Sequence, residues 1–368
     1  MIRLHAAISP GEMRVAAWDG VRLHDVALSR AAMPDGVGDL HRARISARVR
    51  AMAGAFVALE GGVEGFLPDS EAALEGEGRI LGVRIARAAQ GGKGPRLTAK
   101  LTPDEAALIG TGAPALLHRG PDALARMAEA YPDAPIIIDD AATAAHSPRK
   151  AELVARAFSD ELEDAWEALS APIADLPGGA HMQISPTPAL VAIDIDLGSA
   201  SAQRGSKTHT QGEANRALLP ELARQIRLRN LAGAILVDLG GMPQKKRAGL
   251  TPEFVRALAS DPLKPRFLGF TQLGLAEIVR PRVLPPLHEV LTGPHALGLA
   301  ALRRLVREAA AAPHRALSLH ASAEIATALL ADSAAQTDVA ARTGRHLPIV
   351  SHPEWGAGRV SIEEHSHG

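Results

Sequence analysis

Apolar and polar positions alternate along the first third of the chain, and short turn signals interrupt the alternation. Residues 13–17 and 21–28 predict two strands that flank a hairpin turn at Asp19-Gly20. Further short alternating runs, such as residues 43–49, are separated by glycine pairs. Short strands at this spacing predict a small β-barrel over residues 36–100.

From Thr102 onward, helical periodicity and longer apolar runs replace this pattern. Three predicted elements follow the barrel, with Ser159 as the N-cap of the last: a helix over 122–130, a strand over 136–138 and a helix over 159–169. A Pro/Gly loop is expected over 172–179. The carboxyl-terminal part, beyond a proline-rich linker, predicts a small α/β domain with these helices: 297–312 and 322–330.

The most informative stretch predicts a strand, a helix and a second strand. Residues 190–197 and 234–239 are apolar runs of strand length, and residues 214–229 place Leu residues on one helical stripe. Pro220 is expected to kink this helix or to mark its true start. The succession is typical of a βαβ-like unit, so the fold class is predicted to be α/β.

Composition limits the class of protein without identifying it. The 368 residues are 46% hydrophobic and 22% charged, with a net charge of -1, which fits a globular protein of two or three domains. No apolar run is long enough to span a membrane, and the start lacks the core of a secretory signal. The absence of cysteine excludes disulfides and thiolate zinc sites. We therefore expect a soluble cytoplasmic protein.

Three aspartates interrupt the two predicted strands. Asp194 and Asp196 alternate along the first strand and so point to the same face, and Asp238 ends the second. Carboxylates converging at strand ends would form an oxygen-ligand site that suits Mg²⁺. The alternative is that Asp194 and Asp196 lie on an exposed edge strand and that Asp238 caps the following loop.

Positive charge gathers around the same strands. Between Arg204 and Arg247 there are nine Lys or Arg residues but only three acidic residues. Such an excess beside a candidate metal site suits a polyanionic substrate. A solvated helix face followed by a basic loop explains the same charges equally well. The arginines predicted to bind RNA lie on the helix between the strands: Arg224, Arg227 and Arg229.

Several motifs occur in an order and spacing that point to one family. They are GAFV (54–57), GFLP (65–68), GKGPRLT (92–98), LVAIDIDLGSA (190–200), ARQIRLRNLAG (223–233) and ILVDLGGM (235–242). Together they resemble the ribonuclease E/G family of bacterial endoribonucleases, and the resemblance covers most of the chain. It implies an RNase H-like catalytic domain with an inserted OB-type barrel and a small C-terminal α/β domain. The implied boundaries are 1–35 with 101–285, 36–100, and 286–368 for the linker and small domain.

The resemblance also implies roles for individual residues. Asp194 and Asp238 match the metal-binding aspartates, and Asp196 stands where relatives usually have a supporting asparagine. We therefore expect these three aspartates to be catalytic and Mg²⁺ to be the cofactor. In the barrel, Phe56, Phe66 and Lys93 match residues that contact RNA, although two such phenylalanines alone would more often be core residues. The expected activity is Mg²⁺-dependent endonucleolytic cleavage of single-stranded RNA during RNA processing or turnover, leaving 5′-phosphate and 3′-hydroxyl ends.

The chain departs from the family pattern in three respects. It has no match to the arginine-threonine motif that senses a 5′-monophosphate, it lacks the cysteine zinc link between subunits, and Gly241 replaces a second family acid. We therefore expect a shortened member of the family that is a monomer or a weak homodimer. Two alternatives remain open from the sequence: an RNA-binding protein in RNA maturation with weak or no turnover, and an unrelated metal-dependent phosphatase.

Overall fold

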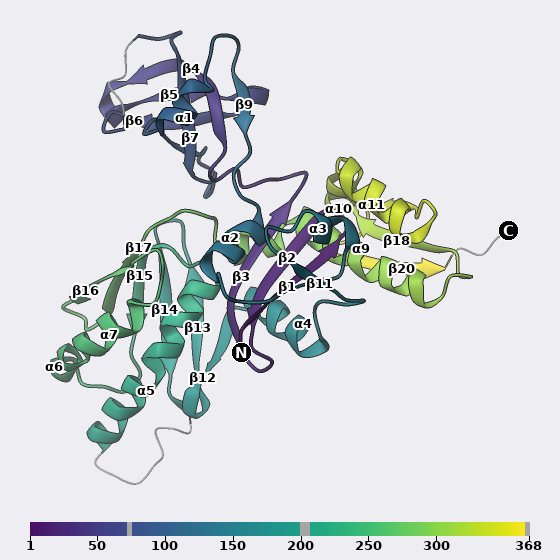
Figure 1. The fold of residues 1–368 in the computed structure, drawn as a ribbon. Helices are drawn as coiled ribbons and strands as arrows, with labels where there is room; N and C mark the ends of the chain where they lie inside the picture. The colour runs from purple at the N-terminus through teal and green to yellow at the C-terminus, as the bar shows by residue number, and fades with distance from the viewer. Residues whose placement is uncertain (72–75, 199–206, 365–368) are drawn as a thin grey trace. The chain divides into compact units, whose positions relative to one another are not determined.

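The computed structural model describes residues 1–71, 76–198 and 207–364 of the chain. The chain divides into two compact units, each assembled from separate stretches of sequence (Figure 1). The first unit comprises Met1–Asp35, Pro121–Ala165 and Glu289–Gly368, and the second comprises Gly36–Gly120 and Trp166–His288. Among the helices of the described residues, none combines the length and the hydrophobicity that crossing a bilayer requires.

A closed five-stranded barrel forms the first part of the second unit. Its strands are β4 (Leu40–Val49), β5 (Gly54–Ala58), β6 (Glu64–Pro68), β7 (Ile80–Arg87) and β8 (Arg96–Thr98). They lie in the order β4-β5-β6-β8-β7, and β4 pairs with both β5 and β7, which closes the barrel. An irregularity between Ile45 and Ala47 bends β4 so that it can pair with both β5 and β7. The predicted barrel is confirmed, and its closure is consistent with an OB-type barrel.

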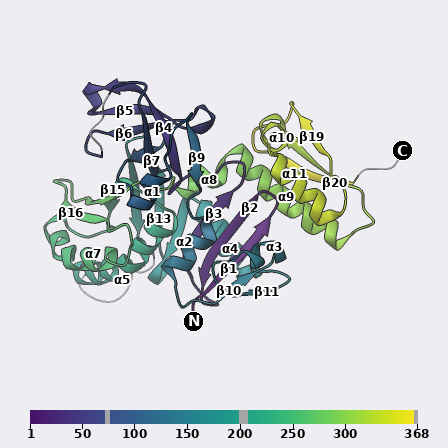
Figure 2. The same ribbon diagram turned by 45° about the horizontal axis from the view of Figure 1, so that its top comes forward.

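Two shorter elements accompany the barrel. They are α1 (Pro103–Ala107) and β9 (Ala115–His118), which pairs with β4. The interior of the barrel is filled by alternate residues of its strands: Ala43, Val57, Leu59, Leu67, Val83, Ile85 and Leu97. Figure 2 shows β5, β6 and β7 from a second direction.

A six-stranded sheet forms the rest of the second unit. Its strands are β12 (Ile173–Leu176), β13 (Ala180–Pro186), β14 (Leu190–Asp196), β15 (Gly233–Asp238), β16 (Arg266–Phe270) and β17 (Ala276–Arg280). The order is β12-β13-β14-β15-β17-β16, and β14–β15 is the parallel pair, as a βαβ-like unit requires. β12 lies in the stretch 172–179, so the prediction of a loop throughout that stretch is wrong.

Helices cover one face of this sheet. They are α5 (Lys207–Leu228) and α7 (Thr251–Leu258), which share a core with the strands, and the short exposed helix α6 (Gln244–Arg247) lies between them in the sequence. α5 continues through Pro220, so the alternative that this proline marks the start of the helix is wrong. The predicted strands over 190–197 and 234–239 are confirmed within one residue at each end.

The amino-terminal part of the first unit is a second, separate sheet. Its strands are β1 (Arg3–Ser9), β2 (Glu12–Trp18), β3 (Leu23–Arg30), β10 (Ile136–Ile138) and β11 (Ala151–Leu153), in the order β11-β10-β1-β2-β3. The predicted hairpin at Asp19-Gly20 joins β2 and β3, and Asp19 Oδ1 accepts hydrogen bonds from the amides of Val21 and Arg22. β1 is an additional strand that the alternation did not indicate.

The helices of this part begin where their capping residues predict. They are α2 (Ala123–Ala130), α3 (Ala141–Ala145) and α4 (Asp160–Glu167), which starts in the first unit. Asp122 caps α2 by accepting a hydrogen bond from the Ala125 amide at 2.8 Å. Ser159 Oγ accepts a hydrogen bond from the Leu162 amide at 3.3 Å, so the predicted N-cap of α4 is confirmed.

The carboxyl-terminal part of the first unit is a small α/β layer. Its elements are α8 (Leu287–Thr292), α9 (Pro294–Ala311), β18 (Leu317–Ser322), α10 (Ala323–Leu330), α11 (Ser333–Thr343), β19 (Ile349–His352) and β20 (Val360–Glu364). The two predicted helices correspond to α9 and α10. The expected linker over 281–294 is partly helical, because α8 lies within it and Pro294 occupies the first turn of α9.

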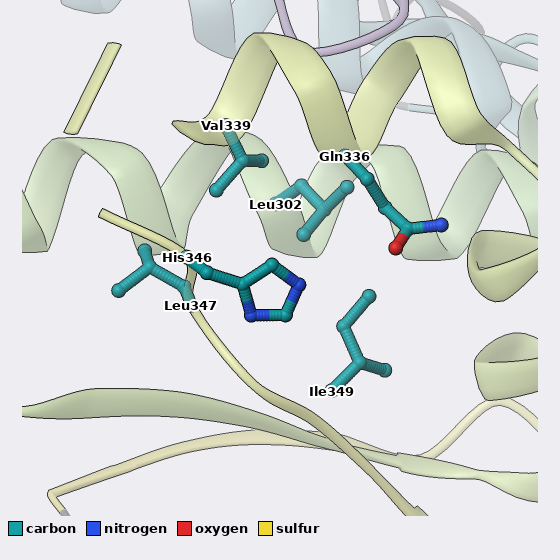
Figure 3. A pocket seen from close by; sticks show the side chains of 6 residues that line it. All are labelled: Leu302, Gln336, Val339, His346, Leu347 and Ile349. Carbon is teal, nitrogen blue, oxygen red and sulfur yellow. The ribbon is translucent and has the colours of Figure 1, made fainter. Parts of the chain in front are cut away.

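A cavity between α9, α11 and the segment before β19 is too small for an organic ligand. Its volume is about 10 Å³, the space of a single water molecule. Figure 3 shows the side chains that line it: Leu302, Gln336, Val339, His346, Leu347 and Ile349. Because four of these six side chains are aliphatic, we regard the cavity as a packing gap.

A network of charges, all buried or half-buried except the exposed Arg307, joins α9 to the amino-terminal sheet within the first unit. The residues are Glu12, Arg14, Arg30, Glu163, Arg303 and Arg307. Glu163 accepts two hydrogen bonds from Arg14, at 2.6 and 3.0 Å, and one from Arg307. Glu12 accepts a hydrogen bond from Arg303 at 3.0 Å. Removing one partner of such a network leaves a buried charge without its counterion, so the members of the network stabilise the unit together.

We expect the first unit to lose stability in acid through Glu163. Burial by itself raises the pKa of Glu163, but the hydrogen bond and charge of Arg14 and the charge of Arg307 lower it to about 2. Because this folded-state pKa lies below the ordinary value of 4.5, the stabilisation is complete above pH 4.5 and is lost as the pH falls through 2. Glu163→Gln should lower the free energy of unfolding by about 3 kcal/mol at pH 7 and by far less in strong acid.

Denaturant unfolding of the parental protein and the variant, at neutral pH and in strong acid, measures this difference. Asp164→Asn is the control, because Asp164 is exposed on the same helix. A difference between Glu163→Gln and the parental protein that stays constant with pH would contradict the linkage.

Candidate active site and RNA interface

The parallel pairing of β14 and β15 positions two carboxylates. In this register Asp194 lies directly beside Asp238, each near the carboxyl end of its strand. Neighbouring strands are about 4.8 Å apart, so the two side chains leave the sheet side by side. Parallel strands need a long crossover, and α5 supplies it.

The aspartates lie on the face of the sheet opposite α5 and α7. Along β14 the side chains of Ile193 and Ile195 are buried in the core beneath these helices, whereas Asp194 and Asp196 are exposed. Asp238 is likewise exposed next to buried Val237. The expectation that Asp194 and Asp196 share a face is therefore confirmed. β14 pairs on both sides, so the edge-strand alternative is wrong.

Asp196 has its own set of partners. Its Oδ1 accepts a hydrogen bond from the Gly198 amide at 2.9 Å, and its Oδ2 lies 3.5 Å from His181 Nε2. His181 is the register partner of Asp196 on β13. Asp196 is thus oriented by its local turn and by the neighbouring strand. Residues 199–206, which include Arg204 and the end of the 190–200 motif, lie outside the described residues.

Arg247 lies against Asp238. Its Nη1 donates to Asp238 Oδ1 at 2.9 Å and to the Gly274 carbonyl at 2.7 Å. Its Nε and Nη2 donate to the carbonyls of Met242 and Leu239. The guanidinium therefore closes the turn after β15 and places one positive charge at the carboxylate pair. Two further cations on α6, Lys245 and Lys246, are exposed.

Gly241 has a steric reason to be glycine. Its φ is +67°, a conformation that residues with a Cβ rarely adopt. A Cβ here would also lie 2.5 Å from Gln211 Nε2, and Gln211 is buried. A carboxylate side chain, which the resemblance to the ribonuclease E/G family implies at this position, therefore does not fit without displacing Gln211.

The predicted RNA-contacting residues of the barrel lie on neighbouring strands and one turn. Phe56 and Phe66 are register partners, and their rings are 5.8 Å apart at an interplanar angle of 70°. Both are half-buried. The residues that follow them in the sequence, Val57 and Leu67, are buried in the barrel core. Lys93 is exposed at the end of a tight glycine turn, where its amide and carbonyl pair with Gln90.

The three arginines predicted to bind RNA, two in α5 and one directly after it, differ in environment. Arg224 is half-buried and forms an ion pair with Glu221, and Arg227 Nη1 lies 3.4 Å from the Ser260 carbonyl. Arg229 is buried and donates to the carbonyls of residues 168, 169 and 171 and to the side chain of Gln225. Burial lowers the pKa of Arg229 to about 10, so it remains charged at neutral pH. Arg229 therefore secures the segment that leads into β12.

Two residues near the carboxylates were not singled out by the sequence. Arg247 is one of the nine basic residues counted there, and nothing local distinguishes it from Lys245. His181 meets Asp196 through a cross-strand register that no sequence spacing reveals. Among the described residues, no three His, Cys, Asp or Glu side chains gather closely enough to hold a metal ion by themselves.

Comparison with known proteins agrees with this organisation. The model of the ribonuclease E/G family matches residues 120–283, which contain the whole six-stranded sheet and its three aspartates. Ribonuclease E of Nostoc sp. (strain PCC 7120) is 36% identical over 167 residues, which are 42% of this chain and 24% of that protein. Ribonuclease E of Synechocystis sp. (strain PCC 6803) is 37% identical over 129 residues, 35% of this chain and 19% of that protein.

Ribonuclease G of Escherichia coli (strain K12) is similar over a region of comparable length. It is 33% identical over 121 residues, which are 32% of this chain and 24% of that protein. Over residues 120–283, which include the sheet and its carboxylate edge, the chain is therefore similar to the ribonuclease E/G family. The matched region spans a quarter or less of the length of each relative.

We expect Arg229→Ala to destabilise the protein. The substitution leaves three backbone carbonyls without their charged donor, so the free energy of unfolding should fall by about 3 kcal/mol. Arg216→Ala is the control, in the helix that precedes Arg229, because the ion pair of Arg216 with Glu253 is partly exposed and contributes about 0.5 kcal/mol. Denaturant unfolding measures both variants, and equal losses would contradict the structural role of Arg229.

Proposed function

We propose that this protein is a Mg²⁺-dependent endoribonuclease that cleaves single-stranded RNA during RNA processing or turnover. The observation that carries the proposal is the register pairing of Asp194 and Asp238 on an exposed sheet face. Relatives named Ribonuclease E and Ribonuclease G, which match this part of the chain, support it. The family's division into an RNase H-like domain over 1–35 and 101–285, a barrel over 36–100 and a small domain over 286–368 belongs to the same proposal.

The side chains at this edge fit a magnesium ion. Mg²⁺ prefers oxygen ligands and is usually held by one or two carboxylates, with water and substrate phosphate completing the octahedron. Asp194 and Asp238 supply two carboxylates from adjacent strands, and Asp238 Oδ1 is also bonded to Arg247. Asp196 lies one step further along the same face and is held by Gly198. Such a donor set suits an ion that keeps several of its waters.

Each proposed residue then has a distinct role. Bound Mg²⁺ would neutralise charge on the scissile phosphate and lower the pKa of a bound water. Asp194 and Asp238 hold the ion, and Arg247 fixes the orientation of the Asp238 carboxylate. Phe56 and Phe66 stack bases of a single strand, and Lys93 meets a phosphate. The products would carry 5′-phosphate and 3′-hydroxyl ends.

RNA binding by α5 and α6 is a further part of this proposal. Arg224 and Arg227 are half-buried at the end of α5, and Lys245 and Lys246 are exposed on α6. We leave Arg229 out of the proposed RNA surface, because backbone carbonyls and Gln225 occupy its guanidinium. Lys245 and Lys246 follow the carboxyl end of β15, so they can offset the repulsion between the aspartates and a phosphate backbone, whereas Arg224 and Arg227 lie toward the other end of these strands.

One observation favours a second candidate function, that of an RNA-binding protein with weak or no turnover. A guanidinium occupies one oxygen of Asp238, and Gly241 removes a carboxylate that relatives carry. Both features reduce the negative charge available to a cation. Incubation of labelled single-stranded RNA with and without Mg²⁺ distinguishes the two functions: cleavage supports the endoribonuclease, and binding without cleavage supports the alternative.

Asp194→Asn and Asp238→Asn should each abolish cleavage and leave RNA binding largely intact. Each removes a hard anionic ligand at nearly constant volume. Asp196→Asn is the matched control on the same face, because an asparagine oxygen can still accept the Gly198 hydrogen bond, and we expect it to retain activity. Cleavage rates and melting temperatures of the three purified variants measure this. Parental activity in Asp194→Asn or Asp238→Asn would refute the metal site, and loss in Asp196→Asn would make it an essential ligand.

Cleavage should not depend on the chemistry of the 5′ end. The sequence has no match to the family's 5′-sensing motif, and a terminal phosphate needs donors aimed at it. RNAs that carry 5′-hydroxyl, monophosphate or triphosphate ends should be cleaved at similar rates. Without cysteine, chelators should also leave the mass in solution unchanged. A preference of about tenfold for the monophosphate, worth about 1.4 kcal/mol, would reveal a sensor built from other residues.

A further inference from the structure

Four side chains form a row across the outside of the barrel. Phe56 on β5 is the register partner of Phe66 on β6, which is in turn the partner of Arg96 on β8. Arg96 is the register partner of Arg87 on β7. The row therefore runs at right angles to the strands, with two aromatic rings followed by two guanidiniums.

A local irregularity in β7 turns Arg87 into this row. Ile85 pairs with Leu97, and both point into the barrel core. With regular alternation Arg87 would point the same way as Ile85. The register shifts between Ile85 and Arg87, so Ala86 is an extra residue and Arg87 faces outward opposite Arg96. Bulges commonly re-aim a side chain in this way.

Gly54 leaves room for the aromatic end of the row. A Cβ on Gly54 would lie 2.4 Å from the Phe66 ring and 2.7 Å from the Leu67 carbonyl. The Phe66 ring therefore occupies the space above Gly54, where any side chain would displace it. The Phe56 and Phe66 rings stay half exposed as a result.

The two guanidiniums repel each other, and no carboxylate among the described residues forms an ion pair with either of them. Directly opposed like charges destabilise a strand pair. Burial and then the charge of Arg96 lower the pKa of Arg87, and Arg87 Nε is buried without a hydrogen-bond acceptor. The carboxylate of Glu71 also interacts electrostatically with Arg96, but it accepts a hydrogen bond from Thr98 at 2.6 Å and forms an ion pair with Lys100. An anion beside Arg96 and Arg87 would relieve this repulsion.

We propose that this row binds a single strand of RNA across the barrel, with bases stacked on Phe56 and Phe66 and the adjoining phosphates on Arg96 and Arg87. The inference rests on the proposed function and adds two phosphate-binding residues and a direction for the strand. Strands about 4.8 Å apart put Arg96 within reach of the phosphate of a nucleotide stacked on Phe66. An aromatic surface continued by cations matches a single strand, which offers unpaired bases and a charged backbone.

The test is equilibrium binding of a short labelled single-stranded RNA to the full chain, with EDTA present so that nothing is cleaved. Arg96→Ala should weaken binding about tenfold at moderate salt. It should also reduce the slope of log affinity against log salt by about 0.7, the value for one phosphate on a single strand. Arg87→Ala/Arg96→Ala should reduce the slope by about twice as much. Arg96→Lys should retain the slope.

Arg44→Ala is the matched control. Arg44 is also an exposed barrel arginine, but it pairs in register with Ala58, and Ala58 pairs with Glu64 rather than with an aromatic residue. It should change binding less than about twofold. A duplex of the same sequence should bind more weakly than the single strand, because its bases are not free to stack. Melting temperatures verify that each variant is folded.

Three results would contradict RNA binding by the row: parental affinity and salt slope in Arg96→Ala, equal losses of affinity in Arg96→Ala and Arg44→Ala, or duplex binding as tight as single-strand binding. These outcomes are separable from the endoribonuclease itself. A protein that binds through the row but never cleaves with Mg²⁺ contradicts the proposed activity and retains the row. A protein that cleaves RNA and binds it unchanged as Arg96→Ala retains the activity and contradicts the row.

Discussion

Parallel pairing between β14 and β15 is the constraint on which the candidate active site depends. Parallel strands end at the same edge of a sheet, so their last side chains meet there without help from any loop. The crossover that such a pair requires is α5, and its apolar stripe covers one face of the strands. The opposite face is left for polar residues. One topological requirement therefore accounts for the position of the aspartates, their exposure and the presence of the helix.

The elements that repeat a short pattern could be predicted from the sequence. Alternation in residues 190–197 was sufficient to place Asp194 and Asp196 on one face, because a strand fixes the direction of each side chain by parity alone. The hairpin at Asp19-Gly20 and the cap at Ser159 are likewise local, because their hydrogen bonds span three residues or fewer. Such features need no knowledge of the rest of the chain.

The rest could not be predicted because it depends on partners that are distant in sequence or on broken patterns. β17 pairs with β15 and β16 pairs with β17, although a helical segment separates both strands from β15 in the sequence. The contact between His181 and Asp196 depends on strand register. Arg87 faces outward only because a bulge interrupts the alternation that a sequence analysis has to assume. The prediction that Pro220 could mark the start of the helix was wrong for a related reason. α5 packs on the sheet along its length and continues through a residue that disfavours helix.

The charge network of the first unit has a consequence for how the protein is made. Glu12 finds its partner Arg303 only 291 positions later in the chain. Ribosomes add about 5–20 residues per second, so the amino-terminal strands emerge about 15–60 s before α9 exists. During that interval Glu12 lacks its counterion from α9, so its burial in the sheet is not yet fully compensated. The barrel, whose pairings all lie between residues 40 and 118, has no such delay. Synthesis therefore separates the two ends of the first unit in time, and the inserted barrel can fold before α9 of the first unit has been synthesised.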